Sequence, residues 1–380
     1  MKSIQSIKSL KLIETPNFNK VPVLEKLVLE DCINLRGVHP SIGVHKKLSL
    51  LNLNGCKSLK TLPNKFEMES FEILILFGCS NLNRVPGFGE NMQRVLKLYL
   101  NSTAITKLPT SILHLTGLAL LNIRDCKSLM CLPSTIFNLK FLKEVNVSGC
   151  SKLERLPEIV GNAESVEELD LSGTAIREVP SSIVLLKNLN VLSFSGCKGL
   201  SSFKSTSWYD LLPFYLWPKS PGPLGLSSLS GLCSLIQLNL RDCNLREIPK
   251  DIGCLFSLKG INLSGNCFVF LLDSISQLSN LRWMMLDNCK SLRSLPKLPL
   301  SIIYIWGEGC TSLETVPDLL KPNSLCEVEH LLSNCSKLAD NQGVTDMIFV
   351  VIRRQLQFPL SLSLPPSLCV CVINNMLCMF

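Results

Sequence analysis

Cysteine is the residue type whose abundance first suggests chemistry in this chain. Its 380 residues include 18 cysteines and 4 histidines, side chains that bind zinc, form disulfides or act as nucleophiles. A disulfide framework is typical of short secreted chains. This chain is long, and its first residues, MKSIQSIKSLKL, lack the apolar stretch and the cleavage site of a signal peptide. We therefore expect a reducing compartment in which the thiols stay free.

The spacing of the cysteines indicates a structural role. In LSLLNLNGCKSLKTLP, with Leu48 as origin, leucines stand at offsets +3, +5, +11 and +14, and Cys56 stands at +8. The frame recurs about every 23 residues, as in leucine-rich repeats. Thr or Asn replaces Cys three times, so the +8 slot needs a small buried side chain that bonds to nearby backbone. A metal or redox site would not accept Thr in place of Cys. The slot holds Cys32, Cys56, Cys79, Thr103, Cys126, Cys150, Thr174, Cys197, Cys243, Asn266, Cys289 and Cys310.

Each repeat contains a strand pattern, a turn and a short helical pattern. The leucines at +3 and +5 alternate with other residues, which predicts a short strand with one buried face. Segments such as LPTSILHLTGL begin with Pro and Ser or Thr before an apolar i, i+3, i+6 pattern, which predicts a capped helix or 3₁₀ turn. The fold class is an α/β solenoid, a leucine-rich-repeat horseshoe with a parallel β-sheet on the concave face and short helices or 3₁₀ turns on the convex face.

The positions of the repeats predict the domain organisation. We expect a partial repeat or cap at 1–23, about eight repeats at 24–203 and about four at 232–317. The 46-residue step from Cys197 to Cys243 predicts an inserted Pro/Ser-rich loop or degenerate repeat at 204–231. Residues 318–355 read as a cap with a helix from about Asp346. The apolar tail at 356–380 is too broken by Pro and Asn to span a bilayer, and we expect it to be disordered or to come from a mis-spliced reading frame.

Several phrases carry a specific resemblance. These phrases are ETPNFNKVPVLEKLVLEDCINLRGVHPSIG, LLNLNGCKSLKTLP, GCSKLERLPEIVGNAESVEELDLSGTAIREVPSSI and LSNCSKLADNQGVTD. Over about residues 10–355, the chain resembles the repeats and the following region of plant TIR-NB-LRR disease resistance proteins. The resemblance implies an intracellular immune receptor whose repeats recognise a pathogen effector or a guarded host protein and restrain a nucleotide-binding domain. The sequence has no TIR segment before the repeats and no G-x-x-x-x-G-K-[ST] loop, so nucleotide binding and NAD cleavage are not carried over.

No catalytic or cofactor site is predicted. The histidines His39, His45, His114 and His330 have no suitably spaced catalytic partner. Cys326, His330 and Cys335 have metal-like spacing but lack a fourth ligand, so we predict no metal site. The net charge of +8 is spread without a run of like charges, and nucleic-acid binding is not expected. We also expect no membrane association.

Function is therefore assigned to strand positions between the buried leucines, +1, +2, +4, +6 and +7. Three clusters at these positions are candidate partner-binding sites. Aromatic residues dominate protein interfaces, which favours the third cluster, although the terminal segment could cover it. The clusters are a basic one (Lys97, Tyr99 and Arg124), an acidic one (Glu144, Glu167, Glu168 and Asp170) and an aromatic one (Trp283, Met285, Tyr304 and Trp306).

The predicted function is that of a non-enzymatic, cytoplasmic or nuclear sensor region. It would bind a protein, namely an effector, a guarded host protein or the receptor's own nucleotide-binding domain, and contribute to autoinhibition and defence signalling. An extracellular protein, such as a receptor ectodomain or a polygalacturonase inhibitor, is the alternative. Such a protein would carry a signal peptide, paired capping cysteines and N-x-L-x-G-x-I-P turns, where this chain has C-x-x-L-x-x-L-P. A ubiquitin-ligase substrate receptor would need an F-box, for which the first 23 residues are too few.

Overall fold

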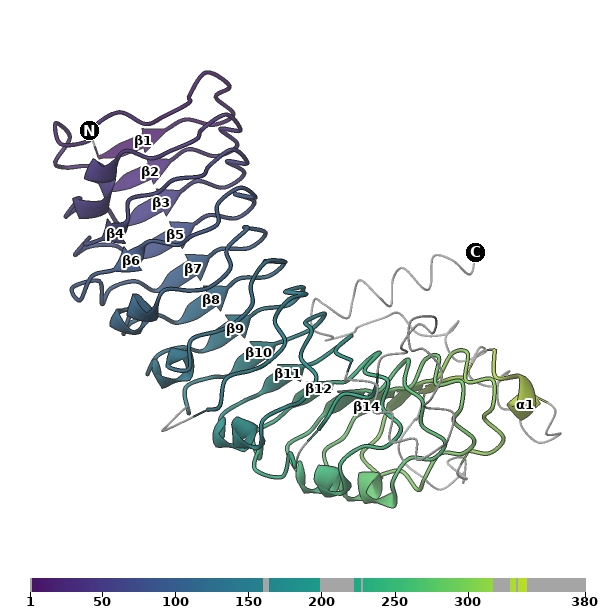
Figure 1. Cartoon of the computed structure of the whole chain (residues 1–380). Coiled ribbons are helices and arrows are strands. Elements are labelled where there is room, and N and C mark those ends of the chain that lie inside the picture. The colour runs from purple at the N-terminus through teal and green to yellow at the C-terminus, as the bar shows by residue number, and fades with distance from the viewer. Residues whose placement is uncertain are drawn as a thin grey trace, which may run out of the picture.

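The chain forms a solenoid built on one long parallel sheet. The computed structural model describes residues 2–159, 164–198, 222–226, 228–316, 329–332 and 334–339. Within these ranges, fourteen short strands form one continuous parallel sheet, in the order in which they occur along the chain. Two further strands, β4 (Lys65–Phe66) and β6 (Gly87–Phe88), form a separate two-stranded sheet. Figure 1 shows the strands stacked along the inner side of the curve, with the helical turns on the outer side. The leucine-rich-repeat solenoid that the sequence predicts is confirmed.

Each strand of the main sheet covers offsets +2 to +4 of one repeat. The +3 residue points into the core, and neighbouring strands align offset for offset, so that Leu121 pairs with Val145 and Leu169 with Leu192. The strands are β1 (Ser3–Gln5), β2 (Lys26–Val28), β3 (Leu50–Asn52), β5 (Ile73–Ile75), β7 (Lys97–Tyr99), β8 (Leu120–Asn122), β9 (Glu144–Asn146), β10 (Glu168–Asp170), β11 (Val191–Ser193), β12 (Gln237–Asn239), β13 (Gly260–Asn262), β14 (Trp283–Met285), β15 (Tyr304–Trp306) and β16 (Glu329–Leu331).

The convex side is built mainly from 3₁₀ turns. Their closing bonds run from residue i+3 to residue i, as from Leu115 N to Ile112 O at 3.0 Å. Two repeats instead place β4 (Lys65–Phe66) and β6 (Gly87–Phe88) there, with both phenylalanines buried. The 3₁₀ turns are η1 (Pro40–Val44), η2 (Thr110–His114), η3 (Ile136–Asn138), η4 (Ser181–Leu185), η6 (Lys250–Cys254) and η7 (Asp273–Gln277). One short α-helix, α1 (Ser336–Ala339), is described near the end.

The sequence pattern predicts that the serines at the start of these turns cap their own turns. Ser111 and Ser182 do not do so. Ser111 Oγ accepts a hydrogen bond from Phe88 N at 2.9 Å, and Ser182 Oγ accepts one from Ile159 N at 3.0 Å. Both donors belong to the preceding repeat. Stacking at constant repeat length brings the hydroxyl over that backbone, so the serine joins two coils instead of closing one.

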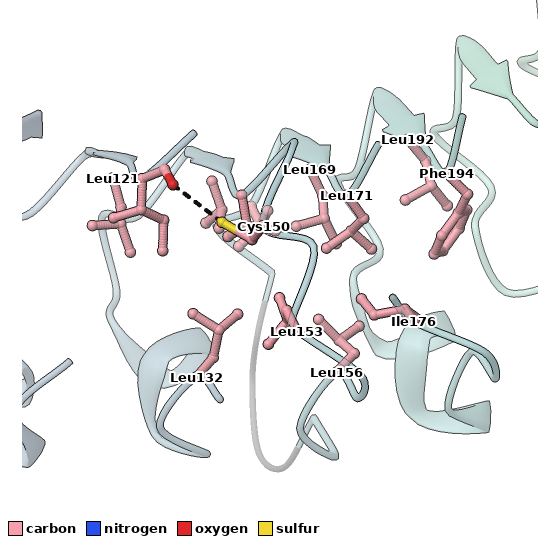
Figure 2. Packing of buried hydrophobic residues seen from close by; sticks show 14 of the residues in the cluster. Leu121, Leu132, Cys150, Leu153, Leu156, Leu169, Leu171, Ile176, Leu192 and Phe194 are labelled. Atoms are coloured by element: carbon pink, nitrogen blue, oxygen red, sulfur yellow. Dashed lines mark hydrogen bonds between the residues drawn. The ribbon is translucent and has the colours of Figure 1, made fainter. Parts of the chain in front are cut away.

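The +8 slot forms a ladder of buried hydrogen-bond donors. The Cys150 thiol donates to Ile123 O at 3.2 Å, as Figure 2 shows, and Cys126 donates to Leu100 O at 3.1 Å. In each case the acceptor is the +5 carbonyl of the preceding repeat. Thr103 Oγ1 donates to the +5 carbonyl of its own repeat, Leu100 O, at 2.8 Å. The side chains above and below the ladder are buried aliphatic residues, so the slot is part of the core.

The coil continues past the 46-residue step and past residue 317. Strands β11 and β12 pair directly, and Leu224 and Leu229 are buried in the core. Gly225 pairs with Glu178 of the neighbouring coil. Of the predicted segment 204–231, residues 222–226 and 228–231 belong to the described part of the coil, and residues 204–221 and 227 lie outside the described residues.

At the other end, β16 pairs with β15. Cys335 donates to Gly307 O at 3.2 Å, so it extends the ladder into the predicted cap. The helix predicted near Asp346 and the tail at 356–380 lie outside the described residues.

Candidate functional site

The +7 position of the repeat carries a backbone constraint that the sequence analysis did not predict. Every described repeat has a residue with positive φ there, because the chain turns sharply out of the strand. Gly fills the position seven times, and Asp, Asn, Ser or Lys fills it elsewhere, as in Asp125 at φ 58° and Asn288 at φ 58°. Glycine and the short polar residues adopt this conformation most readily. The side chains that this row can present to a partner are therefore restricted mainly to Gly and short polar residues.

The +4 position is also partly committed to the fold. In six repeats an Asn or Asp at +4 accepts a hydrogen bond from the backbone N–H of +6 through its side-chain oxygen. Asn146 Oδ1, for example, accepts from Ser148 N at 3.0 Å, and Asp170 Oδ1 accepts from Ser172 N at 3.0 Å. Such bonds end a strand by closing a turn. The recurrence of Asn two residues before the turn was visible in the sequence but was not interpreted.

The predicted basic cluster lies on two adjacent strands. Lys97 and Tyr99 project from β7, Lys97 being exposed and Tyr99 partly exposed, and Arg124 follows β8. The Arg124 guanidinium pairs with Asp125, with Nε 3.3 Å from Oδ2, while both side chains stay largely exposed. This cluster is a solvated patch of mixed charge.

The predicted acidic cluster separates into residues with different environments. Glu144 and Glu168 are direct register partners on β9 and β10, whereas Glu167 forms an ion pair with Lys143 at 2.8 Å. Asp170 belongs to the turn-closing row. Burial raises the pKa of Glu168 above its ordinary value, and the charges of Glu144 and Glu167 raise it further. Like charges placed directly opposite each other are destabilising, so the pair favours a cationic neighbour.

The predicted aromatic cluster is a continuous array. Trp283 pairs in register with Tyr304, and Met285 with Trp306, so the four side chains occupy offsets +2 and +4 of β14 and β15. All four are partly exposed, whereas Met284 and Ile305 between them are buried. The rings of Tyr304 and Trp306 stack with their centroids 5.5 Å apart and an interplanar angle of 14°. We call these four residues the aromatic array.

Gly260 on β13 leaves the space that the Trp283 side chain of this array occupies. A β-carbon built on Gly260 would lie 1.8 Å from Cε2 of Trp283. The indole therefore extends from β14 over the bare backbone of the neighbouring strand. A side chain at Gly260 would displace it, so this glycine positions the indole on the concave face. Gly260 was not predicted as a site residue, although it is the only glycine at +2 in the twelve repeats whose +8 residues run from Cys32 to Cys310.

The buried thiols are poorly suited to nucleophilic chemistry. Burial raises the pKa of the ladder thiols from Cys56 to Cys289, and the thiolate is the reactive form. Cys335 is a ladder member in the structure, while the side chains of Cys326 and His330 lie outside the described part of the chain. Among the residues that can be described, no group of three or more His, Cys, Asp or Glu could hold a metal ion. The thiols whose pKa rises to about 12 are those of Cys56, Cys79, Cys150, Cys243 and Cys289.

Comparison with known proteins gives this surface a context. Residues 66–155 match the family described as "Disease resistance protein RPS4B-like, leucine-rich repeats". The TMV resistance protein N of Nicotiana glutinosa is 39% identical over 297 residues, which are 77% of this chain and 24% of that protein. The disease resistance-like protein DSC1 of Arabidopsis thaliana is 40% identical over 363 residues, 88% of this chain and 28% of that protein.

The chain is homologous to the leucine-rich repeat region of plant TIR-NB-LRR disease resistance proteins. It spans about a quarter of the length of these two resistance proteins. The resemblance that the sequence phrases indicated is thus confirmed for the repeat region. The homologous region is a leucine-rich repeat region, and the resistance-protein relatives extend well beyond it.

Solved structures support the same fold without adding a function. A structure of the TLR13–ssRNA13 complex matches with a TM-score of 0.56 at 19% identity, covering 83% of this chain and 47% of that one. The functional domain of InlJ from Listeria monocytogenes, described as including a cysteine ladder, matches with a TM-score of 0.51 at 13% identity, covering 88% and 63%. Within the described residues, no helix combines the length and the apolar character that crossing a bilayer requires.

Proposed function

We propose that this chain is the protein-recognition region of a plant immune receptor and binds its partner on the concave face of the sheet. The partner is a pathogen effector, a guarded host protein or the nucleotide-binding domain of a full-length receptor. Binding to that domain would contribute to autoinhibition, and release would contribute to defence signalling. The proposed role is non-enzymatic, and the proposed location is the cytoplasm or the nucleus.

The aromatic array is the observation that carries this proposal. The core of the solenoid is closed by the +3, +5 and +8 residues, so the array is not needed to fill it. Large aromatic side chains nevertheless stand partly exposed at the ends of two adjacent three-residue strands. Trp and Tyr are enriched among the residues that contribute most to protein–protein binding. Homology to resistance-protein repeats supports a protein as the partner.

A concave-face variant tests the proposal. The chain would be expressed in plant leaf tissue as the wild type, as Trp283→Ala/Trp306→Ala, and as Phe141→Ala/Phe256→Ala. The last pair is the matched control, because both phenylalanines are exposed, at 61% and 59%, and lie outside the strands. Co-purifying proteins would be quantified by mass spectrometry. We expect a partner that the wild type and the control retain and the tryptophan variant loses.

The opposite result would overturn the proposal. If partners are retained by the tryptophan variant and lost from the control, recognition lies on another face. A separate measurement addresses autoinhibition. The chain would be co-expressed with the nucleotide-binding portion of a homologous receptor, and association should depend on the same two tryptophans.

A further inference from the structure

The aromatic array lies between two edges of opposite charge. At offset +1, before the strands, Lys259 and Arg282 are exposed cations. At offset +6, after the strands, Asp287 and Glu308 are carboxylates. Strand residues rise about 3.3 Å each, so the two edges are about 17 Å apart. A segment of roughly five extended residues would span this distance.

The carboxylates at the +6 edge are available for a partner. Asp287 Oδ1 accepts from Glu308 N at 2.9 Å, and Glu308 Oε1 accepts from Asn334 Nδ2 at 3.3 Å. Neither carboxylate forms an ion pair with a described residue. Arg241, a cation whose charge acts on Asp287, donates from Nε to Asp242 Oδ2 at 3.1 Å. Burial and the neighbouring Glu308 raise the pKa of Asp287, while Arg241 lowers it.

The cations at the +1 edge are also unpaired within the described residues. Neither Lys259 nor Arg282 contributes a side chain to an ion pair, whereas Lys143 at the same offset of β9 binds Glu167. The backbone of both residues is occupied, since Lys259 O accepts from Trp283 N at 3.1 Å and Arg282 O accepts from Tyr304 N at 3.0 Å. Their side chains are thus left for solvent or for a ligand.

We infer that the aromatic array and its two edges bind a short segment of a partner protein that carries a carboxylate at one end, apolar residues in the middle and an arginine or lysine at the other. This inference rests on the proposed protein-binding function and specifies the chemistry of the ligand. The cationic end faces Asp287 and Glu308, where the adjacent Trp306 ring also attracts cations. The acidic end faces Lys259 and Arg282. The apolar middle covers Trp283, Met285 and Tyr304.

Charge complementarity is what selects this ligand over a purely apolar one. An apolar segment would cover the rings but leave the charges at both edges unpaired and partly desolvated, which is unfavourable. A uniformly basic segment would meet Lys259 and Arg282, and a uniformly acidic one would meet Asp287 and Glu308. Only a segment with both signs satisfies both edges at this spacing.

Selection from a displayed library of random short peptides tests the inference. The full chain would be immobilised as the wild type and as three double variants. Asp287→Asn/Glu308→Gln neutralises one edge and keeps the hydrogen bonds of both residues. Lys259→Gln/Arg282→Gln neutralises the other edge. Asp273→Asn/Glu247→Gln is the control, because it removes two exposed carboxylates outside the strands.

We expect the wild type and the control to enrich peptides with an acidic and a basic residue flanking an apolar centre. The Asp287/Glu308 variant should lose the preference for the basic residue, and the Lys259/Arg282 variant the preference for the acidic one. For a synthetic enriched peptide, fluorescence anisotropy should show affinity about tenfold lower in either edge variant. Trp283→Ala should weaken every enriched peptide.

Enrichment without a charge preference, or a preference unchanged by the edge variants, would overturn the inference. Failure to enrich any peptide would also overturn it. Peptides that still bind the edge variants but are lost from Glu144→Gln/Glu168→Gln would place recognition elsewhere on the concave face. In that case the proposed function would stand and this assignment of the ligand would fail.

Discussion

The carboxylate of Asp125 occupies the space that a β-carbon on Gly149 would need. An ideal β-carbon at Gly149 would lie 2.2 Å from Asp125 Oδ1. The two residues hold the +7 position of successive repeats, with φ of 58° and 73°. An Asp at +7 therefore requires a Gly at +7 of the next repeat. The same relationship joins two further pairs, Asp31 with Gly55 and Asp242 with Gly265.

Gly149→Ala should destabilise the chain more than Gly173→Ala. Both alanines would have to adopt a left-handed conformation, which costs about 1–2 kcal/mol. At Gly173 the nearest atoms to a new β-carbon are 3.6 Å away, so no clash is added. Gly149→Ala also meets Asp125, and we expect a loss of more than about 2 kcal/mol in urea unfolding. Adding Asp125→Ala should remove the difference, and equal losses in the two single variants would contradict the account.

Cys150→Thr should be tolerated and Cys150→Asp should not. A threonine hydroxyl can donate to the carbonyl of its own repeat, as Thr103 and Thr174 do at 2.8 Å. An aspartate would bury a charge without a cationic partner, at a cost of about 3–5 kcal/mol. Thermal unfolding followed by circular dichroism would measure both. If the two variants unfold at the same temperature, the slot is not the buried donor site described above.

The ladder thiols should resist alkylation in the folded chain. Burial raises the pKa of Cys150 to about 12, so almost no thiolate exists at pH 8. Cys131 is exposed and serves as the internal control. Iodoacetamide labelling followed by peptide mass spectrometry should modify Cys131 and leave Cys150 unmodified until urea unfolds the chain. Equal labelling of both residues under native conditions would show that the ladder is open to solvent.

Glu168→Gln should stabilise the chain at neutral pH and have no effect in acid. Because the pKa of folded Glu168 is raised above its ordinary value of 4.5, the folded state holds the proton more tightly than the unfolded state. Its contribution to stability is present below pH 4.5 and is lost as the pH rises through the raised folded value. The gain from Glu168→Gln at pH 7 should stay below about 1 kcal/mol, since the group is exposed. Urea unfolding at pH 4 and pH 7 checks this, and a gain that is larger at pH 4 would contradict it.

The variant Trp283→Ala/Trp306→Ala should unfold almost like the wild type. Both side chains are partly exposed on the concave face, and the core beneath them is closed by Met284 and Ile305, which are 0% and 1% exposed. We expect a loss of less than about 2 kcal/mol, compared with 2–5 kcal/mol for Met284→Ala. Thermal unfolding of the two variants makes the comparison. A tryptophan variant as unstable as Met284→Ala would show that the array is part of the core.

The sequence predicted the features that recur in most repeats. Apolar residues at +3 and +5 and a small side chain at +8, usually a thiol, are fixed by burial, so their spacing revealed the coil. Cys335 was missed as a ladder member because it lies 25 residues after Cys310, and His330 stands where the preceding repeats have an apolar +3 residue. The roles of side chains that contact a neighbouring repeat were harder to predict from the sequence. The serines that bond to the preceding coil looked like ordinary helix caps.

The candidate surface was predicted by position but not by environment. Periodicity placed Trp283 and Tyr304 on the same face, yet only the structure shows that the Trp283 indole lies over Gly260. Glu167 and Glu168 are adjacent in the sequence, and their different surroundings come from Lys143 and Glu144 on the neighbouring strand. Pairing between residues 24 apart requires the exact register, which the repeat spacing alone does not give.

The thiol of Cys243 donates to Phe194 O at 3.1 Å across 49 positions of the chain, about twice the usual separation along the ladder. Elsewhere each coil is tied to its neighbour through a short connection. Doubling the length of a closing loop costs only about 0.6 kcal/mol in entropy, so this junction lets the solenoid gain or lose sequence at little thermodynamic penalty. Among the described contacts of the ladder, it also closes the longest loop. Folding should therefore begin independently in the coils before and after this junction, and the two halves should pair when the contact between Cys243 and Phe194 forms.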